Sequence, residues 1–162
     1  MARNKKRRNI YLVLSITWFL LILFLSSQTA DISSELSGGL TEKFLILLER
    51  IKLVEKNAHL DHNLVENFHS IIRKLAHMFE YFVLAIFTYN YLYYDSRKNN
   101  QIIIFSILTV ILAASVDELF QTTIDGRAGQ ISDVLIDTSG GILAIFMSYY
   151  YKKLKARKFI NS

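Results

Sequence analysis

Four long apolar runs constrain the fold of this 162-residue chain more than any other feature. A helix needs about 20 residues to cross the hydrocarbon core of a bilayer, and each run approaches or reaches that length. The apolar residues are gathered in these runs instead of alternating with polar ones, which favours membrane spans over a soluble core. The sequence predicts spans at 10–27, 75–94, 101–120 and 131–151.

Composition excludes several classes of chemistry. The chain has no cysteine, which rules out disulfides, thiolate metal ligands and a cysteine nucleophile. It has no proline either, so no span need carry a proline kink. Its length fits one domain, and we expect a single integral membrane domain over 1–162.

Basic residues mark three stretches that the positive-inside rule places in the cytoplasm. The N-terminal arm holds five Lys or Arg, the 95–100 connection holds two and the tail from 152 holds five, with Asp95 as the one acid among them. We therefore predict four crossings with both termini in the cytoplasm. Topology and anionic lipid account for the basic patches, so we expect the lipid bilayer and no nucleic acid as a partner.

The first run also resembles a secretory signal. Five basic residues precede it, and 27–30 has the small residues of a cleavage site. Its apolar stretch is longer than the usual ~7–15 residues, so we expect a retained first span. Cleavage would not reverse the other three spans.

One long connection, 28–74, is predicted to lie outside. Gly38 and Gly39 interrupt it, and apolar residues then recur at helical spacing. This pattern predicts an extracytoplasmic amphipathic helix that lies on the outer leaflet or caps the bundle. The stretch 60–74 is expected to continue into the second span. We favour a lid without chemistry for this connection.

Ionisable residues within or beside the spans carry the functional signal, since a charge at mid-bilayer costs about 2.5–3.5 kcal/mol on insertion scales. At ~1.5 Å per helical residue, all of them fall in the outer half. The inner parts 81–94, 102–116 and 142–151 contain no Asp, Glu, His, Lys or Arg. A proton-coupled transporter usually carries ionisable residues through the bilayer, so a small-solute transporter is only our third hypothesis.

These ionisable and polar residues form a predicted outward-facing site, because within each span they recur at i, i+3 or i+4. Small residues beside the last of them, Gly140, Gly141 and Ala144, would let another helix approach closely. The candidates for catalysis are His77, Glu80, Asp117, Glu118 and Asp133, and those for substrate binding are Gln28, Arg73, Gln121, Arg127 and Asp137.

Three interpretations of this site stay open. In the first, an ion-pair network of basic side chains and acids only fixes the packing. In the second, one carboxylate or His77 is a general base and a cation holds an anionic substrate. In the third, His77, Glu80 and two further carboxylates bind a metal. No metal motif such as H-E-x-x-H is present, so the sequence assigns no metal ligand, and the cofactor is unknown.

Several short stretches resemble the VanZ-like family of small bacterial membrane proteins, named for a glycopeptide-resistance accessory protein. Two of them close the first predicted span and open the second, and the third runs from the end of the third span into the fourth. The stretches are 24–28, 73–81, 117–121, Gly126-Arg127 and 133–141. The chain departs from the family in lacking a proline before Gly126 and in having Asp137 where asparagine is frequent.

The resemblance implies a role at the bacterial cell envelope, in the cytoplasmic membrane. The family's namesake phenotype is lowered susceptibility to teicoplanin-type glycopeptides, but the resemblance supplies no reaction. We expect an all-α polytopic bundle whose site binds or modifies a lipid-linked envelope precursor or surface component. Arg73 and Arg127 would hold its anionic group, since guanidinium suits phosphate. The rival hypothesis is a non-catalytic envelope factor that contacts a partner or the glycopeptide.

Overall fold

The computed structural model describes residues 2–28, 30–54, 61–95, 97–124, 127 and 129–160, and side chains within them except at 2–3, 30–37 and 158–160. The described residues form helices and contain no strand, which confirms the predicted all-α class. The helices are α1 (Ala2–Ser26), α2 (Ala30–Arg50), α3 (His62–Tyr94), α4 (Asn99–Gln121) and α5 (Ile131–Ile160).

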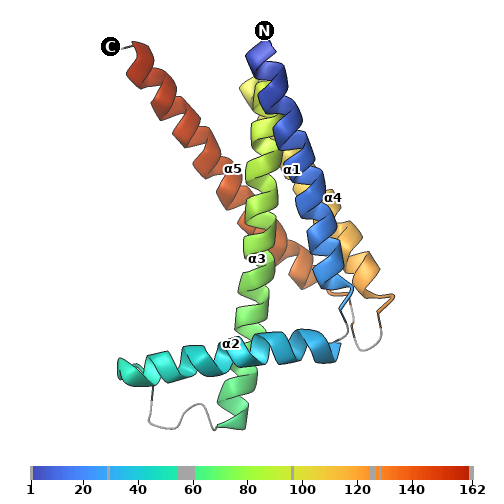
Figure 1. Cartoon of the computed structure of the whole chain (residues 1–162), viewed down its shortest axis with the longest axis vertical. Coiled ribbons are helices and arrows are strands. Elements are labelled where there is room, and N and C mark those ends of the chain that lie inside the picture. The colour runs from blue at the N-terminus through green and yellow to red at the C-terminus, as the bar shows by residue number, and fades with distance from the viewer. Residues whose placement is uncertain are drawn as a thin grey trace.

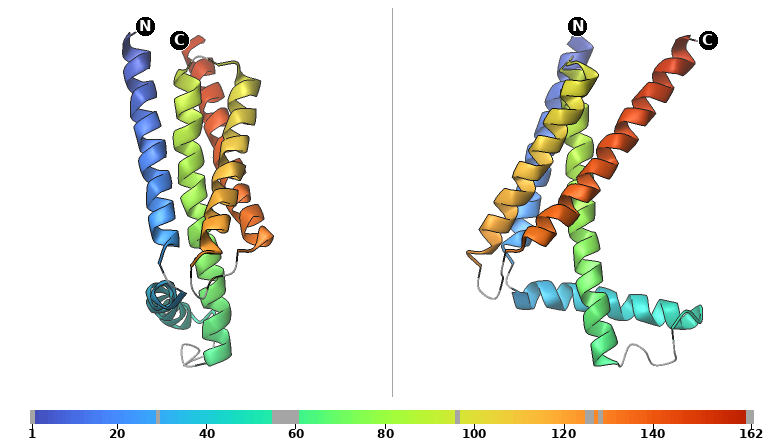
Figure 2. Two further views of the ribbon diagram at one scale, coloured as in Figure 1. Left: turned by 90° about the vertical axis from the view of Figure 1, so that its right-hand side faces the viewer. Right: turned by 180° about the vertical axis from the view of Figure 1, so that it is seen from behind.

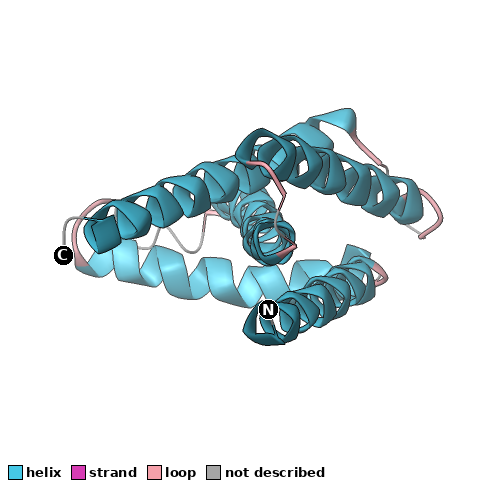
Figure 3. Cartoon of the chain, turned by 90° about the horizontal axis from the view of Figure 1, so that it is seen from above, coloured by secondary structure: helices cyan, strands magenta, loops and turns pink. Residues whose placement is uncertain are grey.

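Helices α1, α3, α4 and α5 form a bundle, and α2 crosses the end of it (Figure 1). Both chain ends lie at the end of the bundle opposite α2, as the two side views of Figure 2 show. Seen from above, α2 extends across the view beneath the upright helices (Figure 3). Helix α3 is the centre of the fold, because each of the other helices packs against it.

Three helices of the described chain are long and apolar enough to cross a membrane: Asn4–Ser26, Asn99–Gln121 and Ile131–Arg157. They coincide with the first, third and fourth predicted spans. The second predicted span lies in α3, whose N-terminal half carries many ionisable residues and whose ion-free part, 81–94, is short. A membrane protein is therefore supported, and the fourth crossing stays a prediction.

Helix α4 has one face buried in the bundle and another, apolar face exposed. One face is buried and runs through Ile102, Ser106, Val110 and Ala113 to Asp117, at helical spacing. The opposite face is largely apolar and open, with Leu112 65% and Leu119 68% exposed, and the Ser115 hydroxyl on it donates to the Ile111 carbonyl oxygen. An apolar surface of this extent suits a bilayer and not water.

Helix α3 is continuous from the outer connection into the bundle, as predicted. It begins after Asp61, whose side-chain Oδ1 accepts hydrogen bonds from the backbone N–H groups of Asn63 (3.0 Å) and Leu64 (3.2 Å). Such an N-cap satisfies donors that the first turn leaves unpaired. The prediction that Gly38 and Gly39 interrupt the outer segment is wrong, because α2 runs through both of them.

Helix α2 contacts the rest of the fold along one edge. Thr41 and Leu45 are fully buried, and the Phe44 ring lies 6.2 Å from the Phe68 ring of α3. Leu40 and Leu47 remain exposed on another side of α2. The helix therefore packs on α3 and keeps a second apolar strip uncovered.

Helices α3 and α5 cross in close contact at Gly140. A Cβ added at Gly140 would overlap the backbone carbonyl of Met78, and one added at Gly141 would lie 2.6 Å from Val110 Cγ1 of α4. The two adjacent glycines thus allow α5 to approach α3 and α4 together. This confirms the role predicted for the small residues of the fourth span.

We expect Gly140→Ala to destabilise the protein by about 1–3 kcal/mol, because the new methyl group meets backbone that has little room to move. Thermal unfolding of the purified protein in detergent measures this. Gly39→Ala is the matched control: an added Cβ there has nothing within 4 Å, so helix propensity should raise stability by about 0.4–1 kcal/mol. Equal effects of the two substitutions would contradict a tight crossing.

Candidate functional site

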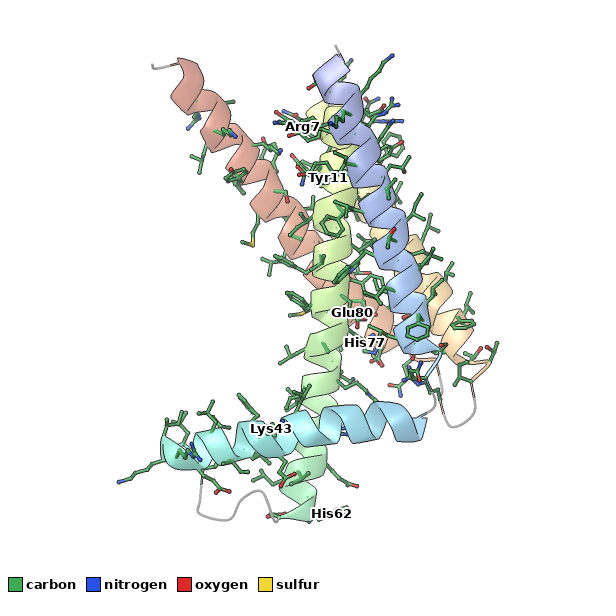
Figure 4. The ribbon with its side chains drawn as sticks, in the orientation of Figure 1. Arg7, Tyr11, Lys43, His62, His77 and Glu80 are labelled. Carbon is green, nitrogen blue, oxygen red and sulfur yellow. The ribbon has the colours of Figure 1, made fainter. Side chains whose placement is uncertain are left out.

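Three helices bring an imidazole and two carboxylates together at the end of the bundle near α2. His77 of α3, Asp117 of α4 and Asp137 of α5 each have a nitrogen or oxygen within 4.8 Å of those of the other two. Both aspartates are buried, with 0% and 1% of their surface exposed, and His77 is partly buried. We call these three residues the His-Asp cluster. Figure 4 labels His77 on α3, above the crossing with α2.

Much of the hydrogen-bonding capacity of the His-Asp cluster is unused. Within the described chain, both carboxylate oxygens of Asp137, Oδ1 of Asp117 and Nδ1 of His77 are buried and have no hydrogen-bond partner. Asp117 Oδ2 accepts one hydrogen bond, from Gln121 Nε2 at 3.2 Å. Buried polar groups are usually satisfied, so a concentration of unpaired atoms at one point is a functional signal.

Two other acids near the cluster, Asp133 and Glu118, have partners. Asp133 forms an ion pair with Lys74 at 3.2 Å, which joins the first turn of α5 to α3. Glu118 Oε2 accepts a hydrogen bond from the backbone N–H of Gln130 at 2.7 Å, which fixes the chain just before α5. These two acids hold elements in place.

Glu80 lies beside His77, with Oε2 3.6 Å from Nδ1, too long for a hydrogen bond. Figure 4 labels the two side chains next to each other on α3. The Glu80 backbone carbonyl accepts a hydrogen bond from Trp18 Nε1 of α1 at 2.9 Å. Helix α1 is therefore anchored directly behind the site.

Arg127 is the basic residue of the α4–α5 connection, and it is partly buried. Burial lowers the pKa of its guanidinium, and the positive charge of Arg73 lowers it further, whereas Asp117, Glu118 and Glu80 raise it. Arg73 and Arg127 thus lie within electrostatic reach of each other and of the acids. Neither arginine is within 4.0 Å of a described carboxylate, so both guanidinium groups keep free hydrogen-bond donors.

The structure separates the predicted residues into those that meet and those that do not. Gln28 has no hydrogen bond to the acids among the described residues, and its Nε2 instead donates to the Phe24 carbonyl oxygen of α1 at 3.5 Å. Gly126 lies outside the described residues. Asp137, predicted to bind substrate, lies in the cluster with His77 and Asp117.

Two contributors were not predicted from the sequence. Trp18 was part of an apolar run, and only its indole N–H hinted that it needs a hydrogen-bond acceptor. Gln130 contributes a backbone N–H, for which a sequence gives no signal. Trp18 comes from a distant part of the chain, 62 residues before Glu80.

A separate groove of about 740 Å³ lies toward the other end of the bundle, between α1, α3 and α5. Apolar residues such as Leu14, Phe82 and Met147 line it, and Arg7 and Lys152 stand among its polar residues. His77, Asp117 and Asp137 are not among its lining residues, so the groove is separate from the His-Asp cluster.

Apolar helices long enough to span a membrane, together with a buried His-Asp cluster at one end of the bundle, define a helical membrane protein with a polar cluster among its helices. A family model described as VanZ/LLP1 matches residues 11–152. This chain therefore belongs to the VanZ family, as its short motifs indicated. Among the curated proteins and among the solved structures, nothing matches it.

We expect Asp117→Asn and Glu118→Gln to differ in stability when metal ions are removed with EDTA. Asp117 has acids but no cation in contact, so Asp117→Asn should leave the melting temperature equal or higher. Glu118→Gln should cost about 1 kcal/mol, because the bond from the Gln130 N–H loses its charge assistance. Thermal unfolding in detergent distinguishes them. A loss of about 3–5 kcal/mol for Asp117→Asn would show that its charge is paired.

Proposed function

We propose that this VanZ-family protein crosses the bacterial cytoplasmic membrane four times and binds an anionic, lipid-linked or surface component of the cell envelope at an outward-facing site. Helix α3 supplies the fourth crossing. Both termini face the cytoplasm, and α2 lies at the outer surface. The His-Asp cluster then stands at outer-leaflet depth, where headgroups and lipid-carried precursors are found.

The observation that carries this proposal is the convergence of unpaired polar groups from three helices at one end of the bundle. Buried, unpartnered atoms of His77, Asp117 and Asp137 lie together, and Arg73 and Arg127 stand nearby without a contacting carboxylate. Guanidinium groups present a planar fork of donors that suits phosphate. The arginines would hold the anionic group and the cluster would face its reactive or hydrogen-bonding part.

The ion-pair network accounts for only part of the site. Asp133 fits this hypothesis, because it forms an ion pair with Lys74. Asp117 and Asp137 do not fit it, because neither has a cation in contact among the described residues. A network that existed only for packing would be expected to pair its most deeply buried charges first, because unpaired buried charges are costly. This favours a binding site over a purely structural role.

Each rival hypothesis would require a different part of the protein. A non-catalytic envelope factor would contact its partner or a glycopeptide through α2, whose exposed Leu40 and Leu47 form an uncovered strip. A small-solute transporter would need polar residues through the inner half, and 81–94 of α3 has no ionisable group other than tyrosine. Lowered susceptibility to teicoplanin-type glycopeptides is the cellular phenotype to measure, as a consequence of envelope binding.

Reporter fusions test the topology. A fusion after Ser162 should report the cytoplasm and one near Lys56 should report the outer side, because 12 of the 19 basic residues lie in the three stretches predicted to be inside. Fusions in the 95–100 connection are the internal control and should agree with Ser162. A cytoplasmic signal near Lys56 would invalidate the outward orientation of the site.

Binding to a polyprenyl phosphate tests the ligand class. The purified protein in nanodiscs should retain the phosphate form in preference to the neutral polyprenol. Arg73→Gln and Arg127→Gln should each weaken this binding at least about tenfold, which corresponds to about 1.4 kcal/mol. Native mass spectrometry with both lipids measures it.

Arg157→Gln is the matched control, since Arg157 is exposed in the tail of α5, far along the helix from the cluster. It should bind as the unaltered protein does. Equal retention of phosphate and neutral lipid, or a loss in Arg157→Gln as large as in Arg127→Gln, would contradict recognition of an anionic group at this site.

A further inference from the structure

We propose that His77, Asp117 and Asp137 form a binding site for a single divalent transition-metal cation of the Zn²⁺ or Mn²⁺ type. The sequence assigned no metal ligand, because no two of these residues lie in a recognised metal motif. They come from three helices, so only the folded bundle assembles the set.

The spacing of the three side chains fits one shared ion. Two ligands of the same cation lie at most twice the metal–ligand distance apart, or about 4.2 Å for bonds of about 2.1 Å. All three ligand atoms lie within 4.8 Å of one another. This bound exceeds the limit of about 4.2 Å by about 0.6 Å, so metal binding requires the most separated atoms to move together by about that amount.

The unpaired atoms distinguish this cluster from an ordinary group of acids. Asp117 and Asp137 are 0% and 1% exposed, and three of their four oxygens have no hydrogen-bond partner among the described residues. Protonation of one aspartate would let its hydroxyl donate to the other carboxylate, but it would leave one negative charge and one of the three free oxygens without a partner. A divalent cation neutralises both carboxylates and fills their free oxygens at once.

Side chains next to the proposed ligands are of the kind that orient metal ligands by hydrogen bonds in known metal sites. Gln121 Nε2 donates to Asp117 Oδ2 and leaves Oδ1 as the free ligand atom. The Glu80 carboxylate lies 3.6 Å from His77 Nδ1, just beyond hydrogen-bond distance. A small shift would let this carboxylate accept from Nδ1–H and leave Nε2 for the metal, as in carboxylate–histidine pairs of known metal sites. Gln121 thus already orients one ligand, and Glu80 is placed to orient the imidazole.

The donor set selects the class of cation. Mg²⁺ and Ca²⁺ prefer all-oxygen sites, whereas an imidazole with two carboxylates suits Zn²⁺ or Mn²⁺. Three protein ligands leave a coordination position open, as in catalytic zinc sites. An anionic oxygen of the ligand could occupy that position. The metal site itself does not depend on the proposed function, because its binding is measured with no envelope component present.

The test uses the full-length protein in detergent, stripped with EDTA and then titrated with Zn²⁺, Mn²⁺ or Mg²⁺ by calorimetry. We expect one Zn²⁺ or Mn²⁺ per chain, weaker binding of Mg²⁺, and a higher melting temperature with the bound metal. Asp137→Asn should weaken binding at least tenfold. His77→Gln should do the same and should remove the imidazole signature from the X-ray absorption spectrum.

Asp95→Asn is the control for a carboxylate outside the cluster. Asp95 follows α3 at the opposite end of the bundle and pairs with Arg8 and Arg97. It should bind metal as the unaltered protein does. Circular dichroism verifies that each variant is folded, and the two ligand variants lie on different helices, so one misfolded variant leaves the other informative.

The proposal is overturned if the unaltered protein shows no saturable 1:1 binding of Zn²⁺ or Mn²⁺. It is equally overturned if folded Asp137→Asn and His77→Gln bind as tightly as Asp95→Asn, because the metal would then occupy surface groups. In both cases the binding of polyprenyl phosphate through Arg73 and Arg127 remains measurable, so the two proposals fail separately.

Discussion

The contact between Gly140 of α5 and the backbone of Met78 on α3 determines the geometry of the polar site. Without a side chain at Gly140, α5 lies directly on α3, and Gly141 is then in contact with Val110 of α4. Met78 is the neighbour of His77, and Asp137 lies about one turn before the two glycines. The close crossing therefore sets the distance between the imidazole and the Asp137 carboxylate.

The third member of the cluster depends on the same packing. The buried face of α4 continues from Val110 to Asp117, so the residue that contacts Gly141 and the residue that meets His77 lie on one side of one helix. A stiff helix transmits the position of the first contact to the second. Core packing and the chemistry of the site are thus coupled through α4 and α5.

Charge in this site is distributed unevenly, and that shapes what the protein can bind. Lys74 neutralises Asp133 at the rim, whereas Asp117 and Asp137 are buried without a contacting cation. Arg73 and Arg127 remain close but unpaired with the described carboxylates. Such an arrangement leaves unpaired acids that can bind a cation and unpaired arginines that can bind an anionic group. A fully paired network would leave neither.

The sequence by itself determined the helical class, the approximate helix bounds and the grouping of polar residues on shared faces. These follow from local rules: apolar length sets a span, and i, i+4 spacing sets a face. It misjudged Gly38 and Gly39, because glycine weakens a helix without ending it, and α2 packs on α3. It grouped His77, Asp117 and Asp137 with seven other residues in one predicted site, but it gave no reason to single out these three as the ones whose side chains converge. Only the tertiary structure decided that, since distances between helices depend on where side chains allow backbones to touch, and no spacing within one helix encodes the crossing point of another.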